Sequence, residues 1–460
     1  MTMTGTISER LAQFTDGLQF EDMPPEVVDK AKRLVLDTVG VCIGSTQIDF
    51  GKSALDMISG WGGTPDATLI GRRTKVPLHS AALCNGILGH GQDYDDTHAE
   101  SVVHPSAALV PVALAAAERS GSSGREMLTA LVAGLEATIR IAMPAYGRFH
   151  LRGFHTTSVA STFGAAAITA KLERAGLRRT VEALGVAGSF ASGLLECIPA
   201  GSYAKRLHAG WAGHCGVMAT QFAQRDCTGP STIFEGKLGA YNSFLRGESL
   251  DLDVIFKGIG REWTTLDIRP KLYPACHYLQ AFLECAAHLR RTFGIRPEDI
   301  EAVSCRIVSN AVGIICEPWE NKLAPNSDYD TRFSLPFAVA VMLVRGRAGV
   351  AEFSAPVAAD PQIRKVMGKV SYVVEPRYQV KDFPAAIDVA MKDGRRHSWE
   401  VPEVRGDAKT PFTLDELMEK FTDNTAHLGA AASSRIAGEM LGLESQADIR
   451  RFMADLCEPA

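Results

Sequence analysis

The stretch PPEVVDKAKRLVLDTVGVCIG, residues 24–44, has the pattern of a helix that packs one face against a core. One helical stripe contains the apolar residues Val27, Ala31, Leu34, Val35, Val39 and Cys42. They recur at the three- and four-residue spacing of an amphipathic helix. Proline at the entry and glycine at the exit are typical helix boundaries. The sequence therefore predicts a core-facing helix here.

The same pattern recurs through the first two thirds of the chain. It predicts further helices over residues 106–117, 125–142, 158–172, 180–191 and 204–225. Each is bounded by Ser, Gly or Pro, which favour helix ends. These segments are rich in alanine, glycine and serine, and small side chains let helix backbones approach closely. We therefore expect a large packed α-helical domain.

The sequence pattern changes from helical to mixed helix and strand after about Pro270. Residues 300–310 and 369–376 have the β-branched alternation of strands, and residues 385–404 resemble two strands joined by a turn at Lys392-Asp393-Gly394. Two further helices are expected at residues 335–344 and 361–367. This part is predicted to form an α+β unit of the usual size of one domain.

A helical sequence pattern returns after Gly406. The residues from Thr413 to Glu416 have the S/T-x-x-E form of a capping box, which opens a helix through Lys420. We therefore predict a mainly α fold: a large all-α helical domain, residues 1–269 and 406–460, with a smaller α+β lid domain inserted at residues 270–405.

Bulk properties favour a small-molecule substrate. The 460 residues carry a formal net charge of -5 and no basic run, which argues against nucleic acid and anionic membranes as partners. The ten cysteines form no C-x-x-C pair, so reduced, mostly buried thiols are expected. The N-terminal MTMTGTISERLAQF lacks signal-peptide character, and no run of about 18 apolar residues occurs. We expect a cytoplasmic protein.

A polar block, GHGQDYDDTHAESVVHPS at residues 89–106, interrupts this apolar sequence. It contains the proton-transfer groups His90, Asp93, Asp95, Asp96, Thr97, His98 and His104. Because unpaired buried charge is costly, these groups are expected at the mouth of a core or paired within it. Such surroundings shift pKa values and favour chemistry. The alternative is a solvated loop with helix-capping aspartates.

Two histidines directly precede predicted helices. His104 comes before Pro105 and Ser106, and His155 before an alanine-rich helix. Backbone N–H groups at a helix start favour anions and lower a histidine pKa, which suits a neutral base. Arg152, close to His155, could pair with a carboxylate. The alternative for both segments is an ordinary capping loop.

Cationic and polar candidates lie at two other places. Lys205 begins a small-residue helix, where it either binds an anion or extends to solvent. Lys271, Tyr273 and His277 stand at the predicted domain boundary, where clefts form, or else belong to a rigid linker. No G-x-G-x-x-G, P-loop, nucleophile-elbow or H-E-x-x-H pattern supports nucleotide binding, a serine nucleophile or a zinc protease.

These separate signals together resemble one family. The motifs are DYDDTH followed by HPS, GFH before a Ser/Ala-rich helix, AKRLHAG, FEGKLGAYNSF, KLYPACH and CEPWENKLAPNSDYDTRFSLPFAVA. In this order, over about residues 10–430, they resemble the MmgE/PrpD family, which includes 2-methylcitrate dehydratase, cis-aconitate decarboxylase and iminodisuccinate epimerase. The resemblance implies a helical domain, an inserted lid, a cleft between them, a homodimer and chemistry without metal or organic cofactor.

The resemblance also implies site residues. The family's acidic and threonine positions fall on Asp93 and Thr97, its two histidines on His104 and His155, and its two lysines on Lys205 and Lys271. In the decarboxylase a histidine directly follows Pro-Ala. Here Cys276 takes that place and His277 comes one residue later.

We therefore expect a cofactor-independent lyase that removes a proton next to a carboxylate of a small di- or tricarboxylic acid, by dehydration of a 2-methylcitrate-like substrate. Lys205, Lys271 and Arg152 are expected to hold carboxylates, with Tyr273, Cys276 and His277 as further candidates. His104 is the expected base, and His155 the proton donor or anion stabiliser. Asp93 would orient a histidine, and Thr97 would donate a hydrogen bond.

Several alternatives remain open from the sequence. Within the same chemistry, the chain could be an epimerase of an iminodisuccinate-like dicarboxylate or a cis-aconitate-type decarboxylase. From different classes, a metal-dependent helical enzyme is suggested by the acid-rich DDTHAE, residues 95–100. A non-catalytic ligand-binding protein is the last alternative.

Overall fold

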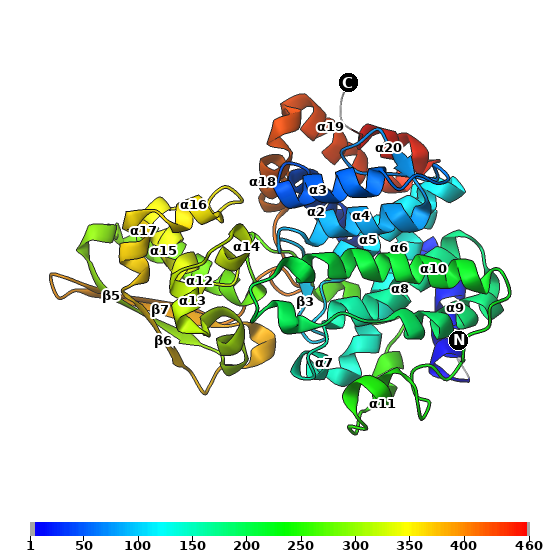
Figure 1. The fold of residues 1–460 in the computed structure, drawn as a ribbon, viewed down its shortest axis with the longest axis horizontal. Coiled ribbons are helices and arrows are strands. Elements are labelled where there is room, and N and C mark those ends of the chain that lie inside the picture. Colours follow the sequence, from blue (N-terminus) through cyan, green and yellow to red (C-terminus); the bar gives the residue numbers. More distant parts are fainter. Residues whose placement is uncertain (1–4, 458–460) are drawn as a thin grey trace.

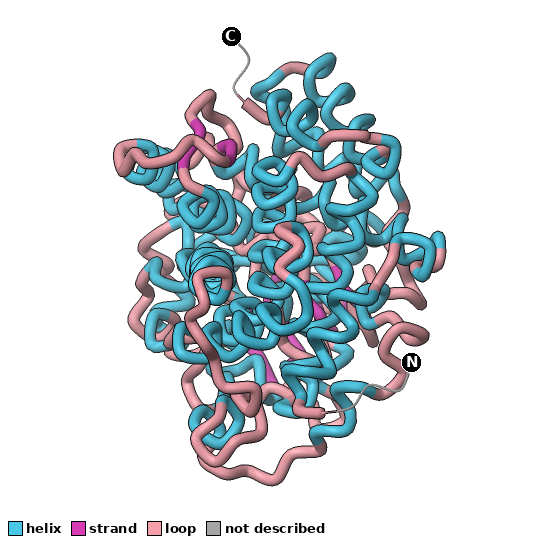
Figure 2. Tube along the Cα trace, turned by 90° about the vertical axis from the view of Figure 1, so that its right-hand side faces the viewer, coloured by secondary structure: helices cyan, strands magenta, loops and turns pink. Residues whose placement is uncertain are grey.

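The computed structural model describes residues 5–457 and consists of a large helical part and a smaller part that carries the main sheet. Figure 1 shows the smaller part projecting from one side of the helical part. Helix dominates throughout, and strands are few (Figure 2). The predicted mainly α fold is confirmed.

The large part contains most of the helices. They are α1 (Ile7–Gly17), α2 (Pro25–Ser45), α3 (Asp49–Ser59), α4 (Leu78–His90), α5 (Pro105–Ser120), α6 (Gly124–Ala142), α7 (Arg148–Leu151), α8 (Thr156–Leu172), α9 (Gly176–Phe190), α10 (His208–Ala223) and α11 (Ala240–Leu245). Two short strand pairs also belong here: β1 (Ala67–Thr68) with β2 (Lys75–Val76), and β3 (Thr97–His98) with β4 (Ile268–Arg269).

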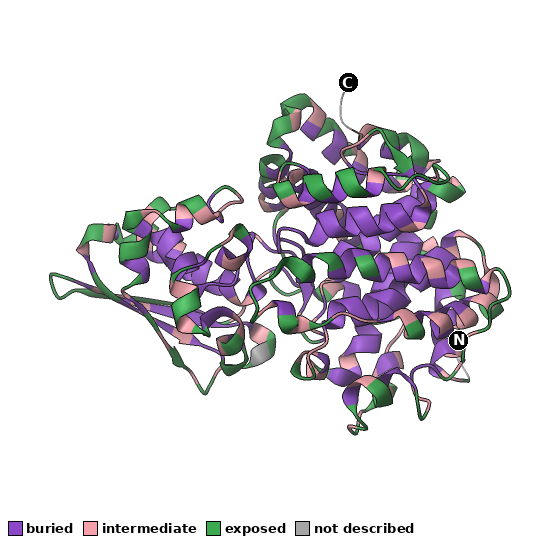
Figure 3. Ribbon diagram, in the orientation of Figure 1, coloured by how far each residue is buried: buried purple, intermediate pink, exposed green. Residues whose placement is uncertain are grey.

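The centre of the large part is a stack of almost fully buried helices (Figure 3). The small residues predicted from the sequence let them approach closely. A Cβ added to Gly86 of α4 would stand 2.6 Å from the Cα of Gly210 in α10, so this crossing requires glycine. It places the end of α4 beside the start of α10. The predicted helix 204–225 is here two elements, the 3-10 helix η4 (Tyr203–Leu207) and α10.

Helix α6 continues into a 3-10 turn, and together they form the one helical segment, within residues 5–457, that is long and apolar enough to cross a membrane. Its apolar window is 94% buried inside the protein. It carries the buried ion pair Arg140–Glu136 at 2.8 Å, whose Arg140 also donates to backbone carbonyls. These contacts are those of a core helix.

The smaller part packs helices against a four-stranded sheet of order β6-β5-β7-β8. Its elements are α12 (His277–Phe293), β5 (Ile300–Ile307), α13 (Trp319–Leu323), α14 (Asp328–Thr331), α15 (Leu335–Arg345), α16 (Ala355–Ala358), α17 (Pro361–Met367), β6 (Val370–Val374), β7 (Ala385–Met391) and β8 (Arg396–Val401). β5 pairs in parallel with β6 and antiparallel with β7, opposing Cys305 to Ile387. Gly394, at φ +90°, makes the predicted β7–β8 turn.

The C-terminal segment returns to the large part. Its helices are α18 (Leu414–Thr425), α19 (Ala430–Leu441) and α20 (Ile449–Asp455). The predicted capping box is present: Thr413 caps the backbone of Glu416, whose side chain accepts from the Thr413 N–H. Helix α18 packs on α2, and α20 on α5 (Figure 1).

Candidate active site

The polar block forms a buried loop between α4 and α5. The bridge between His98 and Val103 folds it into a hairpin, with the His98 N–H donating to the Val103 carbonyl at 2.8 Å. β3 then pairs with β4, which opposes Thr97 to Arg269. As the register shows, this pairing brings the segment that begins at Lys271 next to the loop. The two segments are about 175 residues apart in the sequence.

Asp93 lies between two buried lysines. Lys205 Nζ donates to its Oδ1 at 2.6 Å, and Lys271 Nζ donates to its Oδ2 at 3.2 Å and to its backbone carbonyl at 2.8 Å. Burial alone would raise the pKa of Asp93, but the two ammonium groups outweigh burial and hold the pKa well below its usual range. Asp93 also raises the pKa of Lys205 against the effect of burial. Asp93 and Lys205 therefore form a charged pair.

His90, at the end of α4, joins a second carboxylate to this triad. Its Nδ1 donates to Asp95 Oδ2 at 2.7 Å, and its Nε2 lies 3.5 Å from Lys205 Nζ. Burial would raise the pKa of Asp95, but His90 and His104 lower it. Asp95 is therefore ionised and fixes which nitrogen of His90 carries the proton.

His104 caps the start of α5 and has the geometry of a neutral base. Its Nδ1 lies 2.7 Å from the Asp96 carbonyl, which can only accept, and 3.0 Å from Thr97 Oγ1. The Nδ1 therefore carries the proton, and Nε2 is left with a lone pair. Burial, reinforced by the Lys271 charge, holds the pKa of His104 well below its usual value. The ring is thus unprotonated near neutral pH.

Three further histidines continue the cluster from α7, α8 and α10. The ring of His155 lies 6.0 Å from that of His104 and 5.6 Å from that of His90. Its Nδ1 is 3.0 Å from the Nδ1 of His208, and the His150 ring stacks against it at 5.8 Å. Burial and the Lys205 charge hold the pKa of His155 well below its usual value.

Helix starts meet at this place. His104 and His155 are the N-cap residues of α5 and α8, His208 is the first residue of α10, and Cys276 caps α12. The partial positive charge of helix N-termini adds to that of the two lysines. The arrangement suits a small anion with several carboxylates.

The other predicted residues lie at the edge of the cluster or outside it. Cys276 is buried, and burial and the Asp93 charge raise its pKa to about 11, so it is a neutral thiol. His277 packs edge-on against Phe383 at 4.4 Å, and both its ring nitrogens lack partners among residues 5–457. Tyr273 packs against the core of the smaller part.

Arg152 is not brought to the cluster. Its guanidinium is partly exposed and pairs with Glu248, with Nη2 donating to Oε1 at 2.7 Å. Arg152 thus binds the carboxylate of Glu248, a side chain of this protein, and not a carboxylate of the substrate. Arg152 follows the short helix α7 and pairs there with Glu248, which is 96 residues away in the sequence. The sequence spacing does not reveal this pair.

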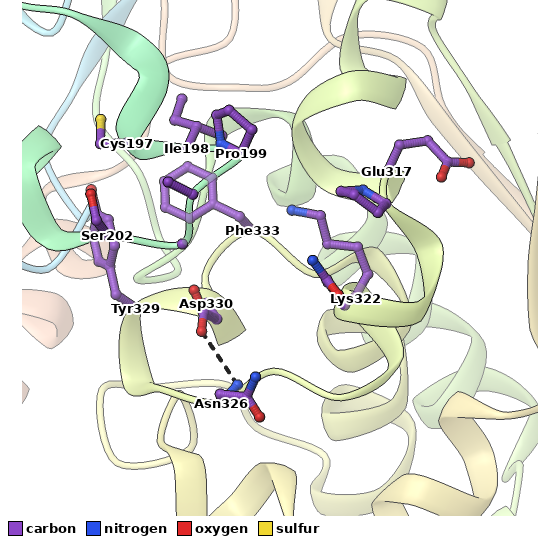
Figure 4. A pocket seen from close by; sticks show the side chains of 14 residues that line it. Cys197, Ile198, Pro199, Ser202, Glu317, Lys322, Asn326, Tyr329, Asp330 and Phe333 are labelled. Carbon is purple, nitrogen blue, oxygen red and sulfur yellow. Dashed lines mark hydrogen bonds between the residues drawn. The ribbon is translucent and has the colours of Figure 1, made fainter.

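A cavity of about 270 Å³ adjoins the cluster between the two parts of the protein (Figure 4). Residues 197–202 line it on one side, and Lys322, Asn326, Tyr329 and Phe333 line it on the other. The Phe333 ring stands 5.5 Å from Lys205 Nζ, which connects the cavity to the charged triad. Asp93 and His104 are not among its lining residues.

Sequence reasoning did not select several of these groups as site residues. His90, Asp95 and His208 lay within motifs that had been recognised. Nothing in the spacing shows that the His90 and His208 rings meet the ring of His155, or that Asp95 binds His90. Lys322 and Tyr329 lay in the last family motif. Their position between the two parts of the chain depends on how α13 and α14 dock against residues 197–202.

The donor set does not resemble a metal centre. Among residues 5–457 no group of three or more His, Cys, Asp or Glu side chains converges in a way that could hold an ion. The histidines hydrogen-bond to a carboxylate, a carbonyl or each other instead.

Comparison of the chain with known protein families identifies its family. The MmgE/PrpD N-terminal domain matches residues 9–253, and the MmgE/PrpD C-terminal domain matches residues 273–443. The chain belongs to the MmgE/PrpD family. The family resemblance found in the sequence motifs is therefore confirmed.

Curated relatives of this MmgE/PrpD protein are similar over most of its length at low identity. The cis-aconitate decarboxylase-like protein oryM of Aspergillus oryzae is 24% identical over 98% of both chains. The cis-aconitate decarboxylase of Homo sapiens is 26% identical over 93% of this chain and 89% of its own. The 2-methylcitrate dehydratase-like protein oryR of Aspergillus oryzae is 25% identical over 49% of this chain and 46% of its own.

Proposed function

We propose that this MmgE/PrpD protein is a cofactor-independent lyase that removes a proton next to a carboxylate of a small di- or tricarboxylic acid, and that the reaction is dehydration of a 2-methylcitrate-like substrate. One observation carries the proposal. The Nδ1–H of His104 donates a hydrogen bond to the Asp96 carbonyl, so its Nε2 is a lone-pair base beside two buried ammonium groups. Dehydration and epimerisation need such a base, whereas loss of carbon dioxide does not.

The lysines bind the substrate carboxylates in this proposal. Each ammonium has three N–H groups, and the contacts to Asp93 and His90 leave one free on Lys205 and one on Lys271. These charges stabilise the extra negative charge that develops when the adjacent carbon loses its proton. Asp93 fixes both lysines, and Thr97 helps to orient His104.

His155 is the proposed proton donor. Its Nε2 is buried and has no hydrogen-bond partner among the described residues. Its ring is 6.0 Å from that of His104 and tilted by 52° to it, so acid and base are separate groups that can act on neighbouring atoms of one small substrate. In dehydration His104 Nε2 takes the proton from carbon while His155 Nε2 gives one to the departing hydroxyl group, which leaves as water.

Proton NMR in deuterated buffer with EDTA tests the proposal. The substrates are 2-methylcitrate, citrate, cis-aconitate and iminodisuccinate. We expect an alkene product from 2-methylcitrate with loss of the hydrogen next to the carboxylate. Deuterium entry without net reaction would instead assign an epimerase. No change in any spectrum contradicts the proposal, and activity that needs added metal supports the metal-dependent alternative.

Decarboxylation is the second candidate because several curated relatives are named cis-aconitate decarboxylases. In that case His155 would deliver a proton to the carbon that loses carbon dioxide. Loss of carbon dioxide from cis-aconitate in the same experiment would favour this reaction. Cys276, in place of the decarboxylase histidine, is the residue to replace by histidine if the rate is low.

We also propose that the protein is a homodimer and works in the cytoplasm. Helix α10 and its flanking turns expose the apolar residues Leu194, Leu207, Trp211 and Phe222, which supports a contact with a second copy. The ten cysteines are all free thiols, which supports a reducing compartment.

A further inference from the structure

We propose that His208 relays protons between solvent and His155. This inference rests on the proposed role of His155 as the proton donor. His208 itself touches no substrate in this account, because it contacts the cluster through His155. It is a positioning residue that acts through His155.

The contact between the two rings carries the proposal. His155 Nδ1 and His208 Nδ1 are 3.0 Å apart, with ring centroids at 5.1 Å. Two nitrogens at this distance share one proton, since an imidazole nitrogen either donates or accepts. When His208 donates, the His155 proton must sit on Nε2, which is the tautomer that can protonate a substrate. His208 thus sets the protonation of His155.

The difference in burial between the two rings indicates the direction of proton transfer, from solvent through His208 to His155. His155 is 0% exposed, whereas His208 retains 9% exposure. The His208 ring lies under the loop of residues 192–194, where a Cβ added to Gly193 would stand 3.6 Å from its Cγ. Leu194 in this loop is exposed. His208 is therefore the member of the pair that bulk solvent reaches while substrate fills the site.

Both rings are neutral at rest. Burial, reinforced by the neighbouring Lys205, lowers the pKa of His208 to about 4. Burial and Lys205 also lower the pKa of His155. A neutral pair can pass a proton without holding a permanent buried charge.

The relay balances over one dehydration. Water protonates His208 Nε2, the shared proton moves from His208 Nδ1 to His155 Nδ1, and His155 Nε2 gives its proton to the departing hydroxyl. The carbon-bound proton is then on His104. After product release, water that enters the emptied substrate site carries this proton to His155 Nε2, the shared proton returns to His208 Nδ1, and His208 Nε2 releases one proton. No net proton is consumed, as dehydration requires.

The decisive variants are His208→Asn and His208→Ala. The asparagine amide occupies the place of Nδ1 and keeps a hydrogen bond to His155, but it cannot relay a proton. We expect kcat to fall about a hundredfold in both variants, near the lower limit for a proton-transfer group. Added imidazole should restore the alanine variant in proportion to its concentration and leave the asparagine variant unchanged. His288→Asn, on α12 where the ring stacks on Trp399 of β8 and away from the cluster, is the matched control.

Two results would overturn the relay. One is a wild-type rate in His208→Asn, because a structural hydrogen bond would then suffice. The other is an alanine variant that imidazole does not restore. If the wild-type protein converts no tested acid, the proposed function fails, and the relay is tested on the unliganded protein. There, ¹⁵N shifts of His155 should change tautomer in His208→Ala, and unchanged shifts would refute the pairing.

Discussion

Single residues in this site take their protonation from their partners. Asp93 stays ionised because Lys205 and Lys271 outweigh the cost of burial, and His104 stays neutral because burial and Lys271 act in the same direction. The sequence grouped Asp93 and His104 in one polar block and gave Lys205 and Lys271 as separate candidates farther along the chain. It did not show that each basic group has a partner of fixed geometry, because that depends on contacts between distant segments.

The depressed pKa of His104 predicts the pH dependence of activity. A base whose pKa is lowered stays unprotonated as the pH falls, so kcat/KM should hold below the ordinary histidine value of about 6.5. The free-enzyme profile, measured with circular dichroism to confirm folding, checks this. A fall of activity centred near pH 6.5 would show that the base is an ordinary, solvated histidine.

Among the elements, those with strong local signals were predicted best. The helix from Pro361 to Met367 and the capping box at Thr413 appear as predicted, because proline entry and the S/T-x-x-E pattern act within one turn. The start of α10 was predicted too early, since residues 203–207 form a 3-10 helix that carries Lys205 into the cluster. The pairing of β3 with β4 has no local signal, as each strand is two residues long.

The buried pair of Lys420 in α18 and Asp37 in α2 fastens the C-terminal segment to the site. Lys420 Nζ lies 2.6 Å from Asp37 Oδ1 and donates to the Tyr94 carbonyl at 2.8 Å. Lys420→Met leaves a buried acid without its partner and should destabilise the protein by about 3 kcal/mol. Denaturant unfolding measures this. The double variant with Asp37→Leu should recover most of the loss, and failure to recover would mean that packing, not charge, is the cause.

At the scale of the whole molecule, the sequence predicted a mainly helical chain with a sheet near its C-terminal end, and the structure has both. Composition and periodicity suffice for that, because they reflect which faces are buried. The family resemblance implied a cleft between the two parts. That residues 197–202 and the helices α13 and α14 line the cavity was beyond prediction, since the lining depends on how the two parts dock.

The exposed apolar residues on and near α10 predict self-association. Light scattering should give the mass of two chains, and Trp211→Glu should shift it toward one chain because a charge would be buried in the contact. The variant should keep its helical circular dichroism spectrum. A wild-type protein with the mass of one chain would refute the dimer.

The central claim, removal of a proton next to a carboxylate by His104, is tested most directly with 2-methylcitrate in deuterated buffer containing EDTA. Proton NMR follows the hydrogen on the carbon beside the carboxylate for the wild-type protein and for His104→Ala, with His98→Asn as the control from the same loop. The account predicts loss of that hydrogen with alkene formation in the wild type and the control, at least about a hundredfold slower in His104→Ala. Equal rates in all three proteins would contradict it.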